Sequence, residues 1–323
     1  MDMKKRILIT GASGFIGTNL VEHIAKKNNV DIINIDFSSP QNLEHYNYWR
    51  NINITDPKKL KEEIVNFSPD YIIHLAARTD LDGKNLNDYL TNTIGTLNII
   101  KACNSLSQLK RVIFASSMLV CKPGYIPSHQ SDYAPSTIYG ESKMEMEKII
   151  RKENPKFEWA IIRPTSIWGP GFGIPYRNFF DMIIKKQYFH IGSAASTKTY
   201  GFVGNVVHQI DSILNAPTEK IQGQVFYLGD YEPTNIKTWA DEIGAELGVK
   251  IKTIPHYLIK LAALGGDILK QFGIHFPMTS FRLKNMTTDN IIDLSNTNEL
   301  LQELPFTRKE GIKMTLEWLK RNP

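Results

Sequence analysis

The most constraining feature of the chain is the glycine-rich segment 10–17 (TGASGFIG), which joins a short apolar run to an amphipathic pattern. Gly11 permits a tight turn, Gly14 lets the backbone approach a pyrophosphate, and Gly17 allows a helix to pack closely. The helix N-terminus then offers unpaired N–H groups and a favourable dipole to the anion. A strand, turn and helix in this order predict a dinucleotide-binding site.

Short β-branched runs alternate with helical patterns through the first half of the chain, which is typical of a parallel sheet with crossover helices. Strands are expected at residues 6–10, 31–36, 71–75, 111–115 and 159–163. Helices are expected between them at residues 15–26, 57–67, 86–105 and 139–152. The sequence therefore predicts an α/β fold with a doubly wound parallel sheet, the Rossmann fold.

The pattern loosens after residue 163. A strand near residues 224–229 is expected to return to the main sheet. Further helices are expected at residues 179–186, 239–247, 257–272 and 309–320. We expect a dinucleotide-binding domain in residues 1–168 and a smaller, interleaved, mainly C-terminal α/β substrate lobe in residues 169–323.

Asp36 ends the second expected strand and indicates which nicotinamide cofactor is bound. A carboxylate there can accept both ribose hydroxyls of NAD but would repel the 2′-phosphate of NADP. The following residues, 37–39 (FSS), include no arginine to neutralise such a phosphate. NAD is therefore favoured over NADP. An aspartate that only caps the loop is the alternative.

Tyr139 and Lys143 lie four residues apart, which places a phenol and an ammonium on one face of a helix. A free tyrosine has a pKa near 10, about three units too high for a base at neutral pH, and a neighbouring cation stabilises the phenolate. Ser116 and Ser117 follow a strand at the carboxyl edge of the sheet, where ligands bind in such folds. Their hydroxyls either contact a substrate or cap the strand. For Asn92, in mid-helix, a structural role is the default interpretation.

These segments together resemble the extended short-chain dehydrogenase/reductase family, in its branch of nucleotide-sugar epimerases, dehydratases and ketoreductases. The resemblance rests on residues 10–17, Asp36, 74–77 (HLAA), 92–96 (NTIGT), 116–117 (SS), 139–143 (YGESK) and 163–171 (RPTSIWGPG). It implies that Tyr139 is the base or acid, that Lys143 binds the nicotinamide ribose and lowers the tyrosine pKa, and that Ser117 orients the reacting oxygen. The implied cofactor contacts are Gly11, Ser13, Gly14, Phe15, Ile16, Gly17, Asp36, Asn53, Ile54, Leu75, Ala76, Ala77, Asn92, Ser116, Tyr139, Lys143, Pro164 and Ser166.

Several departures from the family pattern bear on the reaction. Asn53 replaces the acidic residue that usually contacts adenine, and residues 120–122 (VCK) replace a usual Val-Tyr-Gly. Sugar 4,6-dehydratases of the family carry an Asp-Glu pair after the catalytic Ser or Thr, where this chain has Met118 and Leu119. Neither side chain moves protons, so dehydration is not expected. Oxidation or reduction at one sugar carbon remains, by an epimerase or by a 4-ketoreductase or dehydrogenase.

The resemblance further implies that the substrate is a nucleoside-diphosphate sugar. The candidate substrate contacts are Arg78, Thr79, Ser117, Met118, Tyr139, Arg177, Asn178 and Arg282. A guanidinium suits a diphosphate by its bidentate geometry, although a surface role stays open for Arg177 and Arg282. A reductase of a non-nucleotide ketone and a non-catalytic dinucleotide-sensing protein are the alternatives.

Charge and cysteine content exclude several other classes. The formal net charge of +5 is dispersed, so no nucleic-acid partner is expected. Two cysteines, Cys103 and Cys121, provide neither a disulfide framework nor metal-ligand spacing. No signal-peptide or membrane-length apolar stretch is found, which predicts a cytoplasmic protein with no membrane partner. A homodimer is expected from family habit alone.

Overall fold

The structure is a computed structural model that describes residues 4–192, 196–271, 280, 283 and 287–323. A seven-stranded sheet in the order β11-β6-β5-β4-β1-β2-β3 lies at its centre, and every neighbouring pair in it is parallel. Its strands are β1 (Lys5–Thr10), β2 (Val30–Asp36), β3 (Trp49–Asn51), β4 (Tyr71–His74), β5 (Arg111–Ala115), β6 (Glu158–Pro164) and β11 (Val225–Leu228). The strand order reverses direction between β1 and β4, which confirms the predicted doubly wound Rossmann fold.

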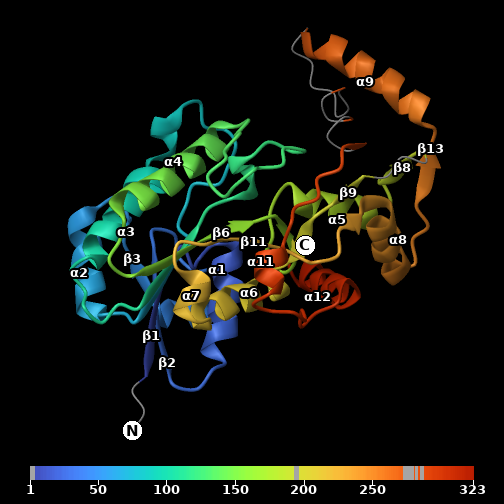
Figure 1. Ribbon diagram of the computed structural model, residues 1–323. Helices are drawn as coiled ribbons and strands as arrows, with labels where there is room; N and C mark the ends of the chain where they lie inside the picture. The colour runs from blue at the N-terminus through green and yellow to red at the C-terminus, as the bar shows by residue number, and fades with distance from the viewer. Residues whose placement is uncertain (1–3, 193–195, 272–279, 281–282, 284–286) are drawn as a thin grey trace.

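Two layers of helices cover the sheet (Figure 1). One layer holds α1 (Phe15–Ala25) and α6 (Val203–Asn215), and the other holds α2 (Pro57–Phe67), α3 (Thr96–Cys103) and α4 (Ile138–Glu153). Successive strand residues point to opposite faces, so Ile7 and Ile9 pack with α1 while Leu8 packs with α2 and α3. Burial on both faces explains the nearly continuous apolar runs of these strands.

The remaining elements form a smaller lobe built around short strand pairs. These pairs are β7 (Ser166–Trp168) with β10 (Tyr200–Phe202), β8 (Phe189–Ile191) with β13 (Lys252–Ile254), and β9 (Thr197–Lys198) with β12 (Thr234–Asn235). Its helices are α5 (Tyr176–Ile184), α8 (Ile236–Leu247), α9 (His256–Gln271) and α12 (Arg308–Arg321). The short helices α7 (Thr218–Ile221) and α11 (Ser295–Asn298) instead contact β6 and β11 of the main sheet. Short 3₁₀ turns are η1 (Leu43–Asn47), η2 (Leu86–Tyr89) and η4 (Met118–Val120).

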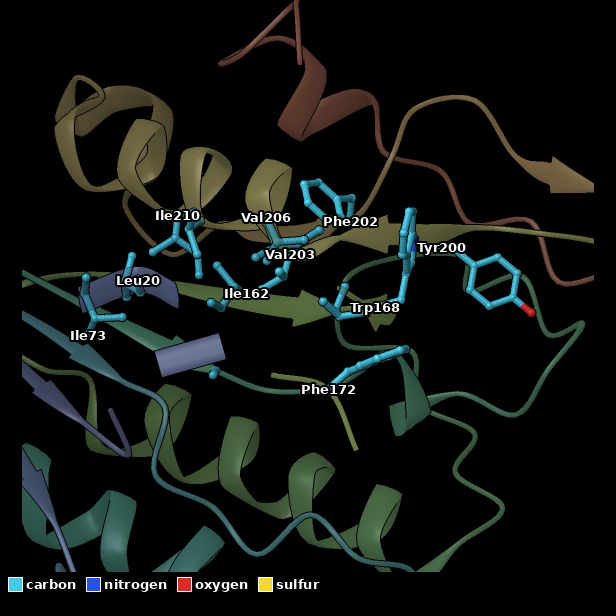
Figure 2. Close-up of a cluster of buried hydrophobic side chains, with 14 of the residues drawn as sticks. Leu20, Ile73, Ile162, Trp168, Phe172, Tyr200, Phe202, Val203, Val206 and Ile210 are labelled. Atoms are coloured by element: carbon cyan, nitrogen blue, oxygen red, sulfur yellow. The ribbon is translucent and has the colours of Figure 1, made fainter. Parts of the chain in front are cut away.

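One of the hydrophobic clusters runs from the sheet into this lobe. Figure 2 shows Leu20 and Ile162 of the Rossmann layers in line with Trp168 and Phe202 of the lobe. The Trp168 ring lies 5.1 Å from that of Trp239 on α8, measured between centroids. Side chains from the two lobes therefore pack against one another in this cluster.

The secondary structure differs from the expectations in several places, including the short strand pairs of the lobe and the helices α7 and α11, which were not predicted. Strand β3 and helix α6 were not predicted, and α5 begins at Tyr176 rather than at residue 179. The single helix expected over residues 86–105 is divided into η2, a π-helical turn η3 (Thr91–Gly95) and α3. π-Helical turns are rare and accompany local functional or packing demands. Here the turn contains Asn92, whose contacts are described below.

Candidate functional site

The glycine-rich turn forms a cradle that side chains would fill. Gly11 has φ +74°, and a Cβ built there would lie 2.5 Å from the backbone nitrogen of Ala76. A Cβ at Gly17 would lie 2.4 Å from the Cα of Ala12. Gly14 is the N-cap residue of α1 and supplies no side-chain cap, so the first N–H groups of the helix lack a side-chain acceptor. The turn therefore fits a diphosphate anion.

Asp36 lies beside this cradle at the end of β2. Its two carboxylate oxygens accept hydrogen bonds from the backbone N–H of Ser13 at 3.1 Å and of Ser38 at 2.9 Å. Burial raises the pKa of Asp36, and these N–H donors oppose that rise. Each carboxylate oxygen keeps further acceptor capacity. The position therefore fits the ribose hydroxyls of NAD.

Two other predicted cofactor-binding residues follow β3, the edge strand of the sheet. Asn53 is exposed, and its side-chain oxygen accepts hydrogen bonds from the N–H and hydroxyl of Thr55 at 3.0 and 2.9 Å. Ile54 is buried, and a Cβ at Gly95 would lie 2.5 Å from its Cδ1. A cavity of about 280 Å³ adjoins the glycine turn. Its lining includes Ser13, Gly14 and Phe15, together with Trp318 and Asn322 at the end of the chain.

Tyr139 and Lys143 occupy the first turns of α4, which begins behind the capping residue Thr137. The Tyr139 residue is 8% exposed, and its phenol lies near enough to Ser117 for that hydroxyl to influence its pKa. The Ser117 hydroxyl accepts from the N–H of Leu119 at 3.1 Å, which leaves its own hydrogen to donate toward the phenol. Burial raises the pKa of Tyr139 to about 12, while the neighbouring Ser117 hydroxyl acts to lower it.

Lys143 is enclosed beneath this pair. It is 2% exposed, and its ammonium donates to the carbonyl of Ala115 at 2.7 Å. Burial lowers the pKa of Lys143 to about 7, and the carboxylate of Glu147 opposes that shift. The structure therefore brings together a phenol, a hydroxyl and a buried amine at the carboxyl edge of the sheet, as the sequence pattern predicts.

A buried ion pair, which the sequence reasoning missed, lies behind these residues. Glu147 and Arg163 are joined by two hydrogen bonds of 2.8 and 2.7 Å, and their side chains are 0% and 1% exposed. Ser116 donates to Glu147 at 2.6 Å and Tyr133 donates to it at 2.9 Å. The Ser116 hydroxyl is thus engaged inside the protein. The available signal was spacing, because Glu147 is four residues beyond Lys143 on the same helix.

His74, at the end of β4, bridges two hydroxyls inside the sheet edge. Its Nδ1 lies 2.7 Å from the Thr10 hydroxyl and its Nε2 lies 3.0 Å from the Thr96 hydroxyl. Thr96 in turn donates to the carbonyl of Asn92 at 2.8 Å. This order of donors requires the proton on Nε2. Burial, with a smaller repulsion from Lys143, lowers the pKa of His74 to about 3.

Asn92 forms hydrogen bonds both to the loop after β4 and to α4, the helix that contains Tyr139. Its side chain accepts from the N–H of Arg78 at 2.8 Å and donates to the carbonyl of Arg78 at 3.0 Å. It also donates to the hydroxyl of Ser142 at 2.9 Å, and Ser142 donates to the carbonyl of Tyr139 at 2.7 Å. These contacts agree with a structural role for Asn92. The π-helical turn orients its side-chain amide toward Arg78 and Ser142.

The remaining cofactor candidates lie around the same edge. Leu75, Ala76 and Ala77 follow β4 and are partly buried, and the N–H of Ala76 donates to the Thr10 hydroxyl at 3.2 Å. Pro164 ends β6 and Ser166 begins β7. The hydroxyl of Ser166 accepts a hydrogen bond of 2.7 Å from Tyr176, a residue that sequence reasoning did not select.

The predicted substrate arginines are held by neighbouring groups. Arg78 donates to the carboxylate of Asp80 at 2.7 and 3.0 Å, and Arg177 donates to the carbonyl of Asn322 at 2.8 Å. For Arg177 this is the surface role that the sequence left open. Thr79 and Asn178 are exposed, and Arg282 lies outside the described residues.

A larger cavity of about 1000 Å³ begins at Met118, the residue after Ser117. It lies between segment 118–130 and segment 289–298, with Arg163, Tyr227 and Tyr231 in its lining. Ser117 and Tyr139 are not among the described residues that line it. Among the described residues, no cluster of His, Cys, Asp or Glu could hold a metal ion.

The sequence matches a known protein family. Residues 7–229 match the NAD dependent epimerase/dehydratase family. The chain belongs to this family. It is therefore an NAD-dependent enzyme of the extended short-chain dehydrogenase/reductase type, as the resemblance implied, and its nicotinamide cofactor is NAD.

Relatives of similar length differ in the substrate that their names give. An Escherichia coli O157:H7 protein, N-acetyl-alpha-D-glucosaminyl-diphospho-ditrans,octacis-undecaprenol 4-epimerase, is 27% identical over 98% of this chain and 96% of its own. A Bacillus cytotoxicus UDP-N-acetyl-alpha-D-glucosaminuronate decarboxylase is 29% identical over 98% of both chains. The structure of a Bacillus cereus UDP-glucuronic acid 4-epimerase with its substrate and NAD aligns with TM-score 0.76 and 19% identity, covering 98% of this chain and 100% of that one. At 19% identity, the likeness to this solved structure shows only that the two proteins share a fold.

Proposed function

We propose that this family member is an epimerase that oxidises and re-reduces one carbon of a sugar carried on a diphosphate. The observation that carries the proposal is the burial of the Tyr139 phenol, the Ser117 hydroxyl and the Lys143 amine together at the carboxyl end of β5, where Lys143 donates to the Ala115 carbonyl. The sequence predicts a nucleoside diphosphate as the carrier. The name of the E. coli relative adds a polyprenol diphosphate as a second possible carrier.

The glycine cradle, Asp36 and segment 75–77 would hold NAD, with Pro164 and Ser166 beside the nicotinamide. NAD supplies the hydride acceptor and donor of such a reaction. Asp36 would bind the adenosine ribose, and the uncapped N-terminus of α1 would face the diphosphate. Lys143 would give up its bond to the Ala115 carbonyl and donate to the nicotinamide ribose instead.

Tyr139 would exchange the proton of the sugar hydroxyl. With a pKa of about 12 it is protonated at neutral pH, so it is set to donate. Accepting a proton requires a lower pKa, and a cation within the low-dielectric site provides this because it stabilises the phenolate. Lys143 is the cation on the same helix face, one turn away. Ser117 would hold the reacting oxygen beside the phenol.

The side chains after Ser117 do not favour dehydration. Met118 and Leu119 stand where a 4,6-dehydratase of this family needs an acid and a base. Neither a thioether nor an alkyl group transfers protons at neutral pH. We therefore propose redox chemistry at a single carbon without elimination of water.

The cofactor retained by the purified protein tests the closed redox cycle. We expect about one equivalent of NAD(H) when the protein is denatured and the released nucleotide is identified by chromatography and mass. An empty site that takes up added NAD(H) would favour the second candidate, a net ketoreductase or dehydrogenase. Release of NADP would contradict the role given to Asp36.

Substitution at the centre tests the residue roles. Tyr139→Phe should lower turnover by about 100-fold or more with NAD still bound, since a positioned acid or base contributes 10²–10⁴-fold. Lys143→Met should lower both turnover and NAD affinity. Tyr71→Phe, at the opposite end of β4, is the matched control. Near-normal turnover of the Tyr139 variant with UDP-sugars would refute the assignment.

A homodimer is part of the proposal. Family habit places the contact on the helices of residues 86–105 and 139–152, and Leu90 and Ile94 in this region are 46% and 41% exposed. Light scattering should give a mass twice that of the 36.8 kDa chain. A monomeric mass would remove this part of the proposal and leave the chemistry unaffected.

A further inference from the structure

Helix α9 (His256–Gln271) presents apolar side chains on two opposite faces. Its inner face packs through Ile259 and Ala263 in a small cluster with Ile191 of β8. Its outer face exposes Tyr257 by 65%, Leu261 by 63% and Leu264 by 48%. Figure 1 shows α9 at the outer edge of the molecule, beyond β8 and β13 and away from the layers that flank the main sheet.

The three exposed side chains form one stripe. Their spacing of four and then three residues brings them to the same side of the helix. Ile259 and Ala263 lie on the opposite side, and so the stripe cannot be part of the packing that fixes the helix to β8 and β13. Leu258, 45% exposed, widens the apolar surface. We call Tyr257, Leu258, Leu261 and Leu264 the α9 stripe.

The stretch of sequence that contains the α9 stripe has more basic than acidic residues. Between Glu246 and Asp289 the sequence contains one acidic residue, Asp267. The same stretch contains six basic residues, Lys250, Lys252, Lys260, Lys270, Arg282 and Lys284. Taking these from the chain totals of 38 basic and 33 acidic residues leaves 32 of each. In sequence, the excess of basic residues thus falls in this stretch, and three of its basic side chains, Lys250, Lys252 and Lys260, are described and exposed.

Charge of this sign next to an exposed apolar stripe matches an anionic lipid surface. Amphipathic helices with leucine and aromatic residues on one face and lysine at its flanks lie in the interface plane of a bilayer. Exposed Lys260 flanks the α9 stripe, and exposed Lys250 and Lys252 precede the helix. No helix among the described residues is long and apolar enough to cross a membrane, and the 16 residues of α9 fall short of the roughly 20 that a span requires.

We propose that the α9 stripe docks this protein on the surface of an anionic phospholipid bilayer. The apolar side chains enter the boundary between headgroups and acyl chains, and the lysines contact lipid phosphates. Docking itself does not depend on the reaction. One consequence rests on the proposed function, because a docked enzyme would meet diphosphate sugars whose carrier is a lipid.

Vesicle co-sedimentation of the full-length protein tests the docking. The protein should sediment with vesicles of phosphatidylcholine mixed with phosphatidylglycerol, and much less with phosphatidylcholine alone. Raising the salt concentration should weaken binding, because the charge contribution is screened. Equal affinity for the two vesicle types, or no binding to either, would overturn the proposal.

Two variants separate the apolar and charged contributions. The triple variant Tyr257→Ser, Leu261→Ser, Leu264→Ser should lower the apparent vesicle affinity by about tenfold or more. Lys260→Glu should lower it by roughly 30-fold, as expected from about 1 kcal/mol for each of the two units of charge that change near the surface. The control Val65→Ser removes a side chain that is 45% exposed on α2 and should bind vesicles as the parent protein does.

The oligomeric state distinguishes docking from self-association. A parent protein that dimerises through the α9 stripe would become monomeric in the triple variant and would not bind vesicles. That result would overturn the proposal in favour of a second copy of the chain. Turnover with a soluble UDP-sugar should be unchanged in the folded triple variant. If the parent protein also fails to turn over a soluble UDP-sugar, that result counts against the proposed function and not against the docking.

Discussion

Protonation of His74 should control how stability depends on pH. Its pKa is about 3 in the folded protein, against 6.5 in a free imidazole. Between these values the unfolded chain binds one proton more than the folded chain. The free energy of unfolding therefore falls as the pH falls, by about 1.4 kcal/mol per pH unit from this histidine. The contribution is complete above pH 6.5 and is lost on acidification toward pH 3.

The expected effect is large enough to measure. From pH 7 to pH 5, His74 should remove about 2 kcal/mol from the free energy of unfolding. In His74→Gln this part of the slope should vanish, although the variant starts from a lower stability because two hydroxyl contacts change. His129→Gln, which alters an exposed imidazole in the loop after β5, should keep the full slope.

Urea unfolding at a series of pH values is the assay, with the slope of each variant subtracted from that of the parent. The carboxylates and the other histidines contribute equally to both slopes, so the subtraction removes their contributions. Parallel curves for the parent and His74→Gln would refute the reasoning. If the variant does not fold, nitrogen NMR of the parent protein gives the same answer. A neutral, Nε2-protonated ring at pH 5 is expected, and a doubly protonated ring would contradict the buried network.

Three further substitutions follow from the geometry. Asp36→Asn should weaken NAD binding in calorimetric titration by roughly 10-fold or more, since hydrogen bonds to a charged group contribute about 1.5–3 kcal/mol. Glu147→Gln should lower the free energy of unfolding by about 3–5 kcal/mol, because it leaves the charge of Arg163 buried and unpaired; chemical denaturation measures this. Gly17→Ala places a Cβ 2.4 Å from the Cα of Ala12 and should cost about 1–3 kcal/mol while reducing the NAD content of the purified protein.

The main sheet could be predicted because its signals are local. Each strand from β1 to β6, apart from β3, is an apolar run flanked by polar residues or turns, and the parallel order follows from the crossover helices. β3 escaped prediction because its three residues, Trp49–Asn51, are too few to show a period. The division of the helix over residues 86–105 escaped because it arises from tertiary contacts of Asn92. Propensity alone does not encode such contacts.

The residues around Tyr139 were predictable for a different reason. Tyr139 and Lys143 are related by helix geometry, and Ser117 by the common edge where parallel strands end. The partner of Ser116 was not predictable in this way. Its hydroxyl donates to Glu147, whose charge is balanced by Arg163 from another strand. Pairing between distant segments leaves no local period, and the same limit applies to the contact of Arg177 with the carbonyl of Asn322.

The pairing of Glu147 with Arg163 also bears on the role proposed for Lys143 as the cation that stabilises the phenolate. A carboxylate four residues along the same helix face would ordinarily pair with the ammonium and offset its field. Here two guanidinium hydrogen bonds and the hydroxyls of Ser116 and Tyr133 occupy Glu147. Lys143 donates to the neutral carbonyl of Ala115, which does not cancel its charge. Because desolvation has lowered the lysine pKa to about 7, the remaining field of Glu147 helps to keep the ammonium protonated. The ion pair thus acts behind the site by stabilising the cation without neutralising it.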